Sequence, residues 1–310
     1  MTPGASSAET TLFLVGTARS GSTLLRHVLN RSPLVTIAPE THFMRRAQKL
    51  RLEQRLLESR DEGDLAVLVE ALYGIDQHSR TGYWAWLRRN VAPEHLVERL
   101  RDGERSLKGL FRLLIEVFVD AQPPASRPPV VGEKTPSHLW HVDMLAAWFP
   151  AARFIHTLRD PRAVYASELR RRREGRWGPT RSLRWVPSVI LDRILAPIQV
   201  LQTTLAWRRA ERLDQRYRAD LADRYLLVRF EDLVRNPERH LRRICDHVGI
   251  PFDPSMLATD VLGSSFHADR HGPQGFDPAA IDRWRDHVGA VPQLWFGLTL
   301  RAGMRRHGYL

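Results

Sequence analysis

The chain has 310 residues, with 47 lysines and arginines against 35 aspartates and glutamates, so its formal net charge is +12. Hydrophobic residues make up 43% of the chain and charged residues 26%, which excludes a disordered, collagenous or fibrous protein. A chain of this length forms one large α/β domain or two smaller ones, and we expect a single domain over residues 1–310. The excess of positive charge predicts a partner or ligand that carries negative charge.

The single cysteine and the apolar stretches predict a compartment. Cys245 has no second cysteine to pair with, which favours a reducing environment. Residues 1–10 contain no lysine or arginine, and the apolar run 12–15 is shorter than the core of a signal peptide. The longest apolar stretch, 186–201, contains an aspartate, an arginine and two prolines, so we do not expect it to cross a bilayer. These features predict a cytoplasmic protein, either soluble or peripheral at a membrane.

Short aliphatic runs along the chain predict buried strands, each strong one followed by a helical pattern. The runs are residues 11–16, 34–37, 130–132, 153–158 and 225–229, of which 34–37 is the weakest. This alternation predicts a P-loop-type, three-layer α/β fold with a central, mostly parallel sheet. Helical patterns without a strand fill residues 41–122 and 181–222, which we expect to be helical insertions, with breaks at Pro187 and Pro197.

The first predicted strand ends in a glycine loop, Gly16-Thr-Ala-Arg-Ser-Gly-Ser-Thr23, and a helix over 22–30 follows. Such a loop directs backbone N–H groups and the positive end of the helix dipole at one point, which stabilises an anion. The glycine spacing is that of the Walker A loop, but the Walker lysine is missing and the cation of the loop is an arginine. The loop predicts a phosphate site, with a turn that binds nothing as the alternative. Its residues are Arg19, Ser20, Gly21, Ser22 and Thr23.

A second basic segment, Arg159-Asp-Pro-Arg, follows the strand predicted at 153–158. Asp160 and Pro161 suit the N-cap and the first turn of a helix. Arg159 then lies at the carboxyl end of a strand, where open α/β sheets bind ligands, and Ser167 lies about two turns along the helix. We expect Arg159 and Ser167 to bind a second phosphate; an arginine–aspartate cap without a ligand is the alternative.

Together these segments resemble the sulfotransferases that use 3′-phosphoadenosine 5′-phosphosulfate (PAPS). The loop from Arg19 to Thr23 matches the family's 5′-phosphosulfate loop at every position, and Arg159 and Ser167 have the spacing of its 3′-phosphate segment. Residues 228–237 resemble a third family segment, with Phe230 in place of a tyrosine. The resemblance runs from residue 12 to about 257, and its pattern is closest to the tyrosylprotein and glycan-type branch.

In the tyrosylprotein enzymes the catalytic glutamate lies 21 residues beyond the loop arginine, and here Glu40 follows Arg19 by that distance. The resemblance implies that Glu40 is the general base toward the acceptor hydroxyl. A helix N-cap is the alternative for Glu40, and His42 is the second candidate for the base. Lys134 resembles a family lysine that contacts the transferring sulfuryl group, where its charge would stabilise the bridging oxygen; an ion pair with a carboxylate is its alternative.

Residues 263–266 and 281–285 resemble the loop and helix that complete the nucleotide site in this branch. The resemblance implies that Ser264 or Ser265 donates to the sulfuryl group and that Arg283 reaches the 3′-phosphate; a plain surface loop and helix is the alternative. We expect no metal, because the loop lacks the Walker lysine and an evident acidic metal partner. His138 and His141 lack a third ligand and are interpreted as helix residues.

Seven arginines and one glutamate lie between Arg170 and Arg184, a local net charge of +6 and half of the total excess. A solvated surface is the default interpretation, and electrostatic steering of the nucleotide is one alternative. We favour contact with an anionic acceptor or an acidic membrane surface.

The sequence therefore predicts an enzyme that moves a sulfuryl group from PAPS to an acceptor hydroxyl by in-line displacement, releasing adenosine 3′,5′-bisphosphate. A sugar, a lipid, a phenol and a peptide tyrosine all remain open as acceptors. The alternatives are a P-loop kinase that uses Mg-ATP and a non-enzymatic basic module for nucleic acid or membrane. The basic module explains the charge but neither Glu40 nor the strand-end motifs, so we expect no nucleic-acid partner. The arginine-rich, lysine-poor composition is typical of a GC-rich bacterial genome.

Overall fold

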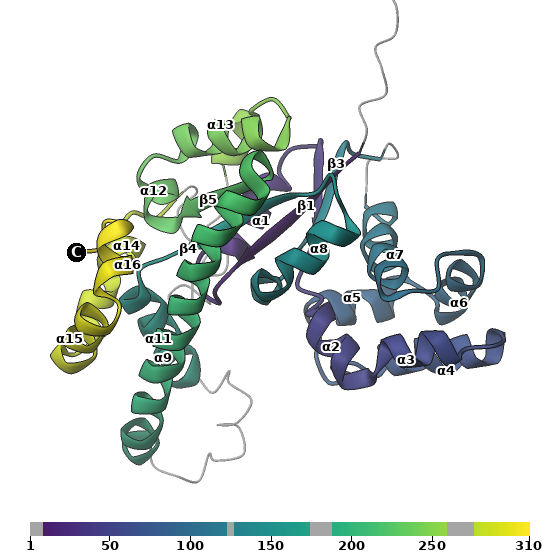
Figure 1. Ribbon diagram of the computed structural model, residues 1–310, viewed down its shortest axis with the longest axis horizontal. Helices are drawn as coiled ribbons and strands as arrows, with labels where there is room; N and C mark the ends of the chain where they lie inside the picture. Colours follow the sequence, from purple (N-terminus) through teal and green to yellow (C-terminus); the bar gives the residue numbers. More distant parts are fainter. Residues whose placement is uncertain (1–8, 123–126, 174–187, 259–275) are drawn as a thin grey trace, which may run out of the picture.

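In the computed structural model, which describes residues 9–122, 127–173, 188–258 and 276–310, a five-stranded sheet forms the centre of the molecule (Figure 1). The strand order is β2-β3-β1-β4-β5, and every neighbouring pair is parallel. The strands are β1 (Thr10–Gly16), β2 (Val35–Ala38), β3 (Val130–Lys134), β4 (Arg153–Leu158) and β5 (Tyr225–Arg229). All five predicted strands are confirmed, and β3 runs two residues beyond its predicted end, to Lys134.

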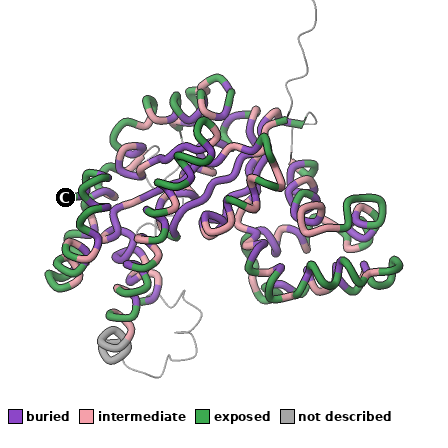
Figure 2. Tube along the Cα trace, in the orientation of Figure 1, coloured by how far each residue is buried: buried purple, intermediate pink, exposed green. Residues whose placement is uncertain are grey.

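The side chains of the central strand β1 alternate between two apolar cores. Phe13 and Val15 belong to one core, Leu12 and Leu14 belong to the other, and all four are fully buried. Successive side chains of a strand point to opposite faces, so both faces of the sheet are covered, as the buried sheet in Figure 2 shows. The predicted three-layer α/β fold of the P-loop type is confirmed.

The helices lie between and after the strands in chain order. Helix α1 (Ser22–Leu29) follows β1. The segment after β2 contains α2 (Phe43–Leu50), α3 (Leu52–Glu58), α4 (Glu62–Tyr73), α5 (Tyr83–Asn90), α6 (Pro93–Asp102) and α7 (Leu107–Asp120). After β3 come η1 (Pro136–His141) and α8 (Val142–Trp148), and after β4 come α9 (Pro161–Arg173), α11 (Ser188–Leu221) and η2 (Ala222–Arg224). The elements after β5 are α12 (Phe230–Arg235), α13 (Pro237–Val248), η3 (Pro254–Leu257), α14 (Ala279–Asp282), η4 (Arg283–Asp286), α15 (Ala290–Thr299) and α16 (Arg301–Arg306).

Helices fill the described parts of both predicted insertions, 41–122 and 181–222. The predicted break at Pro197 is wrong, because α11 continues through this residue. A proline inside a helix removes one backbone hydrogen bond, but α11 is held by its packing against α9, β5 and α15 rather than by propensity alone. Pro187, the other predicted break, lies outside the described residues. None of the described helices is both long and apolar enough to span a bilayer.

Core packing around Phe13 gives a first prediction. Its ring centroid lies 5.5–5.9 Å from those of Phe111, Phe149 and Phe154. Phe13→Ala should therefore lower the free energy of unfolding by about 3–5 kcal/mol, measured by urea denaturation. Leu57→Ala, at a side chain that is 79% exposed, is the control and should change it by less than about 0.5 kcal/mol. Equal effects of the two substitutions would contradict the assigned core.

Candidate active site

The loop between β1 and α1 has the backbone of an anion site. Gly16, Arg19 and Gly21 have φ angles of 154°, 66° and 94°. A Cβ on Gly21 would lie 2.5 Å from the ring of Phe230, and one on Gly16 would lie 2.4 Å from the carbonyl oxygen of Thr157, so side chains are excluded at both positions. Loops of this shape before a helix N-terminus bind anions through backbone N–H groups.

The hydroxyl of Ser20 fastens this loop to the sheet. It donates to the carbonyl oxygen of Thr17 at 2.7 Å and lies 2.7 Å from the hydroxyl of Thr157 on β4. Ser20 is buried, as is Ser22 at the start of α1. In this structure Ser20 holds the loop in place.

The two predicted phosphate-binding segments meet in space, although they are far apart in the chain. Arg19 Nε donates to Ser167 Oγ on α9 at 2.8 Å, and Arg159 Nη1 donates to the carbonyl oxygen of Arg19 at 3.4 Å. Asp160 accepts from the backbone N–H of Arg162 at 2.8 Å, which confirms the predicted cap of α9. Three of the predicted ligand residues therefore form one cluster at the carboxyl ends of β1 and β4.

The guanidinium of Arg159 packs on an aromatic ring. Its guanidinium lies 4.1 Å from the ring centroid of Phe230, and Nη2 donates to the carbonyl oxygen of Ala280 at 2.8 Å. Burial lowers the pKa of Arg159 to about 10, with the charge of Glu231 acting in the opposite direction, so the group stays charged at neutral pH. The sequence placed Phe230 at a tyrosine position, but its double contact with Gly21 and Arg159 was not predicted.

Two buried polar atoms at this cluster have no hydrogen-bond partner among the described residues. They are Thr17 Oγ1 in the loop and Arg159 Nε beside it. A buried donor or acceptor without a partner destabilises the folded state by about 1–3 kcal/mol, so a polar ligand that pairs with these two atoms would be stabilised here.

A buried carboxylate that was not predicted braces the same region. Glu231 on α12 accepts from the backbone N–H of Asp160 at 2.9 Å and from the hydroxyl of Tyr309 at 3.0 Å. Burial raises the pKa of Glu231. Through these bonds α12 and the C-terminal segment fix the start of α9, and with it the position of Arg159.

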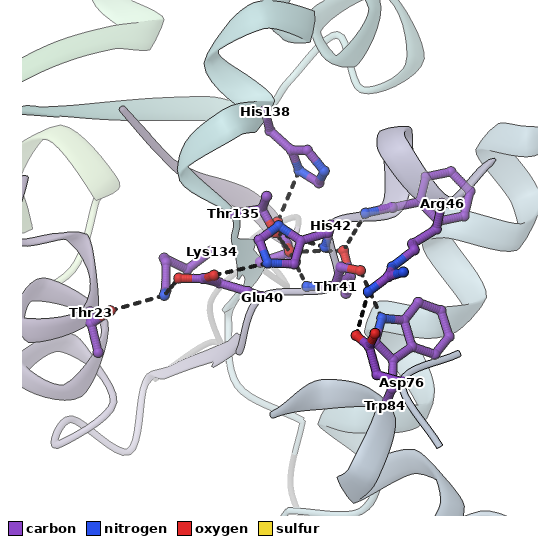
Figure 3. A network of polar contacts seen from close by, with 12 residues as sticks. Thr23, Glu40, Thr41, His42, Arg46, Asp76, Trp84, Lys134, Thr135 and His138 are labelled. Carbon is purple, nitrogen blue, oxygen red and sulfur yellow. Dashed lines mark hydrogen bonds and ion pairs between the residues drawn. The ribbon is translucent and has the colours of Figure 1, made fainter. Parts of the chain in front are cut away.

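The second part of the site is an ion pair between Lys134 and Glu40 (Figure 3). Lys134 Nζ also donates to Thr23 Oγ1 on α1 at 3.1 Å. The other carboxylate oxygen of Glu40 lies 3.1 Å from His42 Nε2. Lys134 thus connects the phosphate loop to Glu40, which is the carboxylate partner that the sequence left open for it.

The surroundings of Glu40 keep it ionised. Burial alone would raise the pKa of Glu40, but the hydrogen bond with His42 and the charge and hydrogen bond of Lys134 lower it to about 2. The side chain of Lys134 is only 4% exposed, and burial lowers the pKa of Lys134 although the charge of Glu40 opposes this shift. The alternative role of Glu40 as a helix cap is excluded, because the N-cap of α2 is His42, in the left-handed region at φ 50°.

A buried network of hydrogen bonds fixes Thr41, the residue next to Glu40. Glu133 Oε1 accepts from the backbone N–H and the hydroxyl of Thr41, both at 2.9 Å, and Trp84 Nε1 donates to the carbonyl oxygen of Thr41 at 2.9 Å. Behind it, His138 Nδ1 lies 3.1 Å from the second oxygen of Glu133. Burial opposes ionisation of Glu133, but His138 and the donors of Thr135 and Thr41 together lower its pKa. The backbone that carries Glu40 is therefore rigidly placed.

The remaining predicted ligands lie nearer the C-terminus. Arg283 donates to Asp277 at 2.5 Å, in the same segment whose Ala280 contacts Arg159. Ser264 and Ser265 lie outside the described residues, as does the chain from residue 174 to Arg184; Arg170 and the three arginines after it end α9. Within the described ranges no three His, Cys, Asp or Glu side chains are grouped as for a metal ion.

The parallel sheet and the glycine loop before α1 place the chain in the P-loop-type class of α/β proteins. Residues 11–254 match the model of the sulfotransferase family, and the chain belongs to this family.

Three named relatives are similar to this chain, and two of them are sulfotransferases by name. The chain is 24% identical over 299 residues to the nodulation protein NoeE of Sinorhizobium fredii, covering 89% of this chain and 60% of NoeE. It is 25% identical over 287 residues to protein-tyrosine sulfotransferase 1 of Danio rerio, covering 91% of this chain and 66% of that protein. A shorter match, 28% over 155 residues, is to the omega-hydroxy-beta-dihydromenaquinone-9 sulfotransferase Stf3 of Mycobacterium tuberculosis, covering 48% of this chain and 35% of Stf3. This chain spans about two thirds or less of each relative.

Two solved structures share the fold over nearly the whole chain. The sulfotransferase domain of the Synechococcus PCC 7002 olefin synthase aligns with a TM-score of 0.55 and 23% identity, covering 96% of this chain and 97% of that domain. The sulfotransferase domain from the curacin biosynthetic pathway aligns with a TM-score of 0.56 and 17% identity, covering 98% and 99%.

The low pKa of Glu40 predicts how stability depends on pH. A carboxyl whose pKa falls from 4.5 to about 2 on folding stabilises the folded state above its unfolded pKa, and this contribution is lost as pH falls toward the folded value. The difference in unfolding free energy between the wild type and Glu40→Gln should therefore be greatest above about pH 5 and shrink between about pH 4.5 and pH 2.

Urea denaturation at a series of pH values measures this difference in unfolding free energy. The same comparison is then made with Lys134→Met added to the wild type and to Glu40→Gln. Removing the ammonium should weaken the pH dependence; an unchanged dependence would show that Lys134 is not its cause.

Proposed function

We propose that this chain transfers a sulfuryl group from PAPS to an acceptor hydroxyl, with Glu40 as general base and Arg19 and Lys134 as electrophilic groups. The observation that carries the proposal is that the phosphate loop and Glu40 meet at the carboxyl ends of the strands. Lys134 contacts Thr23 of the phosphate loop and Glu40 at the same time, while Arg19 of that loop contacts Ser167. Anion-binding groups and a carboxylate base are thereby placed within one side chain's reach of each other.

The residues present fit such a donor. PAPS carries phosphate groups at two positions, and the chain offers two connected anion sites, the glycine loop and the pair Arg159 and Ser167. The unpartnered Arg159 Nε and Thr17 Oγ1, together with the positive φ angles of the glycine loop, support a polyanionic ligand at this place. We assign the loop residues Arg19 to Thr23 to the 5′-phosphosulfate and Arg159 with Ser167 to the 3′-phosphate. Ser264, Ser265 and Arg283 are proposed to complete the site.

When bound, the donor supplies an activated sulfuryl group, whose bond to the bridging phosphate oxygen breaks as the acceptor oxygen bonds to sulfur. Glu40 takes the proton that the acceptor hydroxyl loses. Arg19, Lys134 and the loop N–H groups stabilise the charge left on the departing phosphate. The products are a sulfate ester and adenosine 3′,5′-bisphosphate, and no metal takes part in the proposed steps.

The low pKa of Glu40 makes it a weak base while its ion pair with Lys134 is intact. A phosphosulfate beside Thr23 adds negative charge within reach of the same ammonium, and each additional anion weakens the stabilisation of the carboxylate. We infer that donor binding raises the pKa of Glu40 and so activates it. His42 keeps the carboxylate oriented, and Glu133 acts as a positioning residue through Thr41.

The acceptor class stays open between a sugar, a lipid, a phenol and a peptide tyrosine. The relatives' names mention a dihydromenaquinone and protein tyrosines, which supports hydroxyl acceptors as a class. We propose a cytoplasmic, bacterial enzyme, on the basis of the single cysteine and the arginine-rich composition. The segment from Arg170 to Arg184 is proposed to contact an anionic acceptor or a membrane surface rather than nucleic acid.

Ligand-induced stabilisation tests the donor site. Adenosine 3′,5′-bisphosphate should raise the melting temperature of the wild type, whereas Mg-ATP and duplex DNA should not, since only a ligand that binds the native state stabilises it. Gly21→Ala should lose the shift, because Gly21 has a positive φ and its added Cβ would meet Phe230.

Gly289→Ala is the matched control and should keep the shift, because a Cβ at Gly289 meets nothing within 4 Å. A shift with Mg-ATP alone would indicate a kinase, and a shift with DNA alone a nucleic-acid module; either result overturns the proposed donor.

Transfer assays test the base. Radiolabelled PAPS is offered with a glycoside, a long-chain alcohol, a phenol and a tyrosine peptide, and Glu40→Gln should lower kcat on the best acceptor by about 100-fold to 10,000-fold. His42→Gln is the comparison and should reduce kcat by less than about tenfold, because it removes a hydrogen bond but not the proton acceptor. Retained turnover in Glu40→Gln together with loss in His42→Gln would assign the base to the histidine.

A further inference from the structure

Exposed apolar side chains are concentrated on two neighbouring helices. Of the ten large apolar side chains that are exposed in the described residues, seven lie on α11 and α15, between 42% and 79% exposed. On α11 they are Ile198, Leu201 and Leu205, and on α15 they are Val291, Leu294, Trp295 and Leu298. Soluble proteins seldom expose large apolar side chains in such contiguous groups, and patches of this kind mark interaction surfaces.

On each helix these side chains form a stripe at helical spacing. The stripe on α15 follows i, i+3, i+4 and i+7, and α15 contains no charged residue. The stripe on α11 follows i, i+3 and i+7. Both helices therefore have an apolar face directed to solvent as well as one directed to the core, where Phe296 of α15 is fully buried.

The two stripes form one surface. Trp295 Nε1 donates to Thr204 Oγ1 at 3.0 Å, and Arg208 Nη2 donates to the carbonyl oxygen of Thr299 at 2.7 Å. Both contacts span 91 residues, so α15 runs parallel to this part of α11. At 3.6 residues per turn, the α11 stripe lies roughly 70° to one side of the contact line and the α15 stripe roughly 70° to the other, so both face the same side.

Positive charge borders this surface. Residues 287–310, which include α15 and α16, contain three arginines and no aspartate or glutamate. Two of these, Arg301 and Arg305, are exposed on α16, directly after α15 (Figure 1). The surface is thus apolar, with exposed cationic side chains next to its α15 end.

We propose that this surface of α11 and α15 docks the protein on an anionic lipid bilayer. Apolar side chains that enter the headgroup region, flanked by arginines that meet acidic lipids, are the combination that holds a protein at a membrane interface. A second copy of this chain fits less well as the occupant, because two copies that each carry a net charge of +12 repel each other. Docking on lipid through this surface does not require the proposed reaction.

The surface is also coupled to the site. Trp207, two residues beyond Leu205, donates from Nε1 to the carbonyl oxygen of Arg159 at 3.0 Å. On the other side, the ring of Phe296 packs against Tyr165 of α9 at 5.7 Å between centroids. A protein docked in this way holds the phosphate cluster at a fixed distance from the lipid headgroups.

Flotation with vesicles tests the proposal. The full chain should float with vesicles of phosphatidylcholine and phosphatidylglycerol at about 7:3, and far less with phosphatidylcholine alone. Leu294→Gln with Leu298→Gln should weaken partitioning by about 30-fold or more, because both side chains are about two thirds exposed and would be buried in lipid. Arg301→Gln with Arg305→Gln should weaken it about tenfold on anionic vesicles.

The matched control is Leu57→Gln with Val67→Gln, two similarly exposed apolar residues on α3 and α4, which should float like the wild type. Each variant should keep its melting-temperature shift with adenosine 3′,5′-bisphosphate, which separates docking from donor binding. Absence of flotation, or flotation that the leucine pair does not change, overturns the proposal. A wild-type dimer in sedimentation that the same pair makes monomeric overturns it as well, in favour of self-association.

Discussion

One buried ammonium group sets the geometry of the whole site. Lys134 ends β3, and β3 lies between β2 and β1 in the sheet, so its side chain reaches the segments that follow both neighbours. On one side it meets Thr23 at the start of α1, and on the other it meets Glu40 after β2. A buried charge in this position destabilises the fold unless it is paired. The ammonium group therefore stabilises the fold only while it contacts both Glu40 and Thr23 of the phosphate loop.

Hydrogen bonds elsewhere in the site fix the backbone on which its residues lie. Glu133, adjacent to Lys134 in β3, fixes Thr41 and hence the backbone of Glu40, while Glu231 fixes Asp160 and hence Arg159. Two buried carboxylates that are bonded to the residues next to Glu40 and Arg159 therefore define where the proposed base and a proposed phosphate ligand lie. Because their partners include backbone N–H groups, a substitution of either carboxylate should shift the backbone next to Glu40 or Arg159.

Local patterns in the sequence predicted the parts of this structure that depend on local physics. Strands, the cap at Asp160 and the glycine loop depend on burial period, capping chemistry and backbone φ, which neighbouring residues determine. Glu40 and Lys134 were found through their spacing in a family pattern, not through their ion pair, which joins residues 94 apart. The roles of Phe230, Glu133 and Tyr309 arise from contacts across the sheet, and a single sequence contains no signal for them. The continuous helix at Pro197 was missed because tertiary packing overrode a local rule.

The sequence also does not reveal that the apolar surface of α11 and α15 is exposed. Its stripes are visible in the sequence as helical periodicity, but that pattern alone indicates a buried face, and only the structure shows that this face is exposed. Its bonds to the backbone of Arg159 and its packing on α9 mean that the proposed membrane surface and the proposed phosphate cluster share one rigid support.

If Lys134 couples the donor to the base, the pKa of Glu40 must respond to donor binding, and a titration of Glu40 measures this response. Carbon NMR of a protein with labelled glutamate side chains, with Glu40→Gln used to assign the signal, reports the pKa of this carboxyl with and without PAPS. We expect a pKa of about 2 for Glu40 in the free protein and a clear rise when PAPS is bound. A pKa that starts near the ordinary value, or that PAPS leaves unchanged, would contradict this coupling.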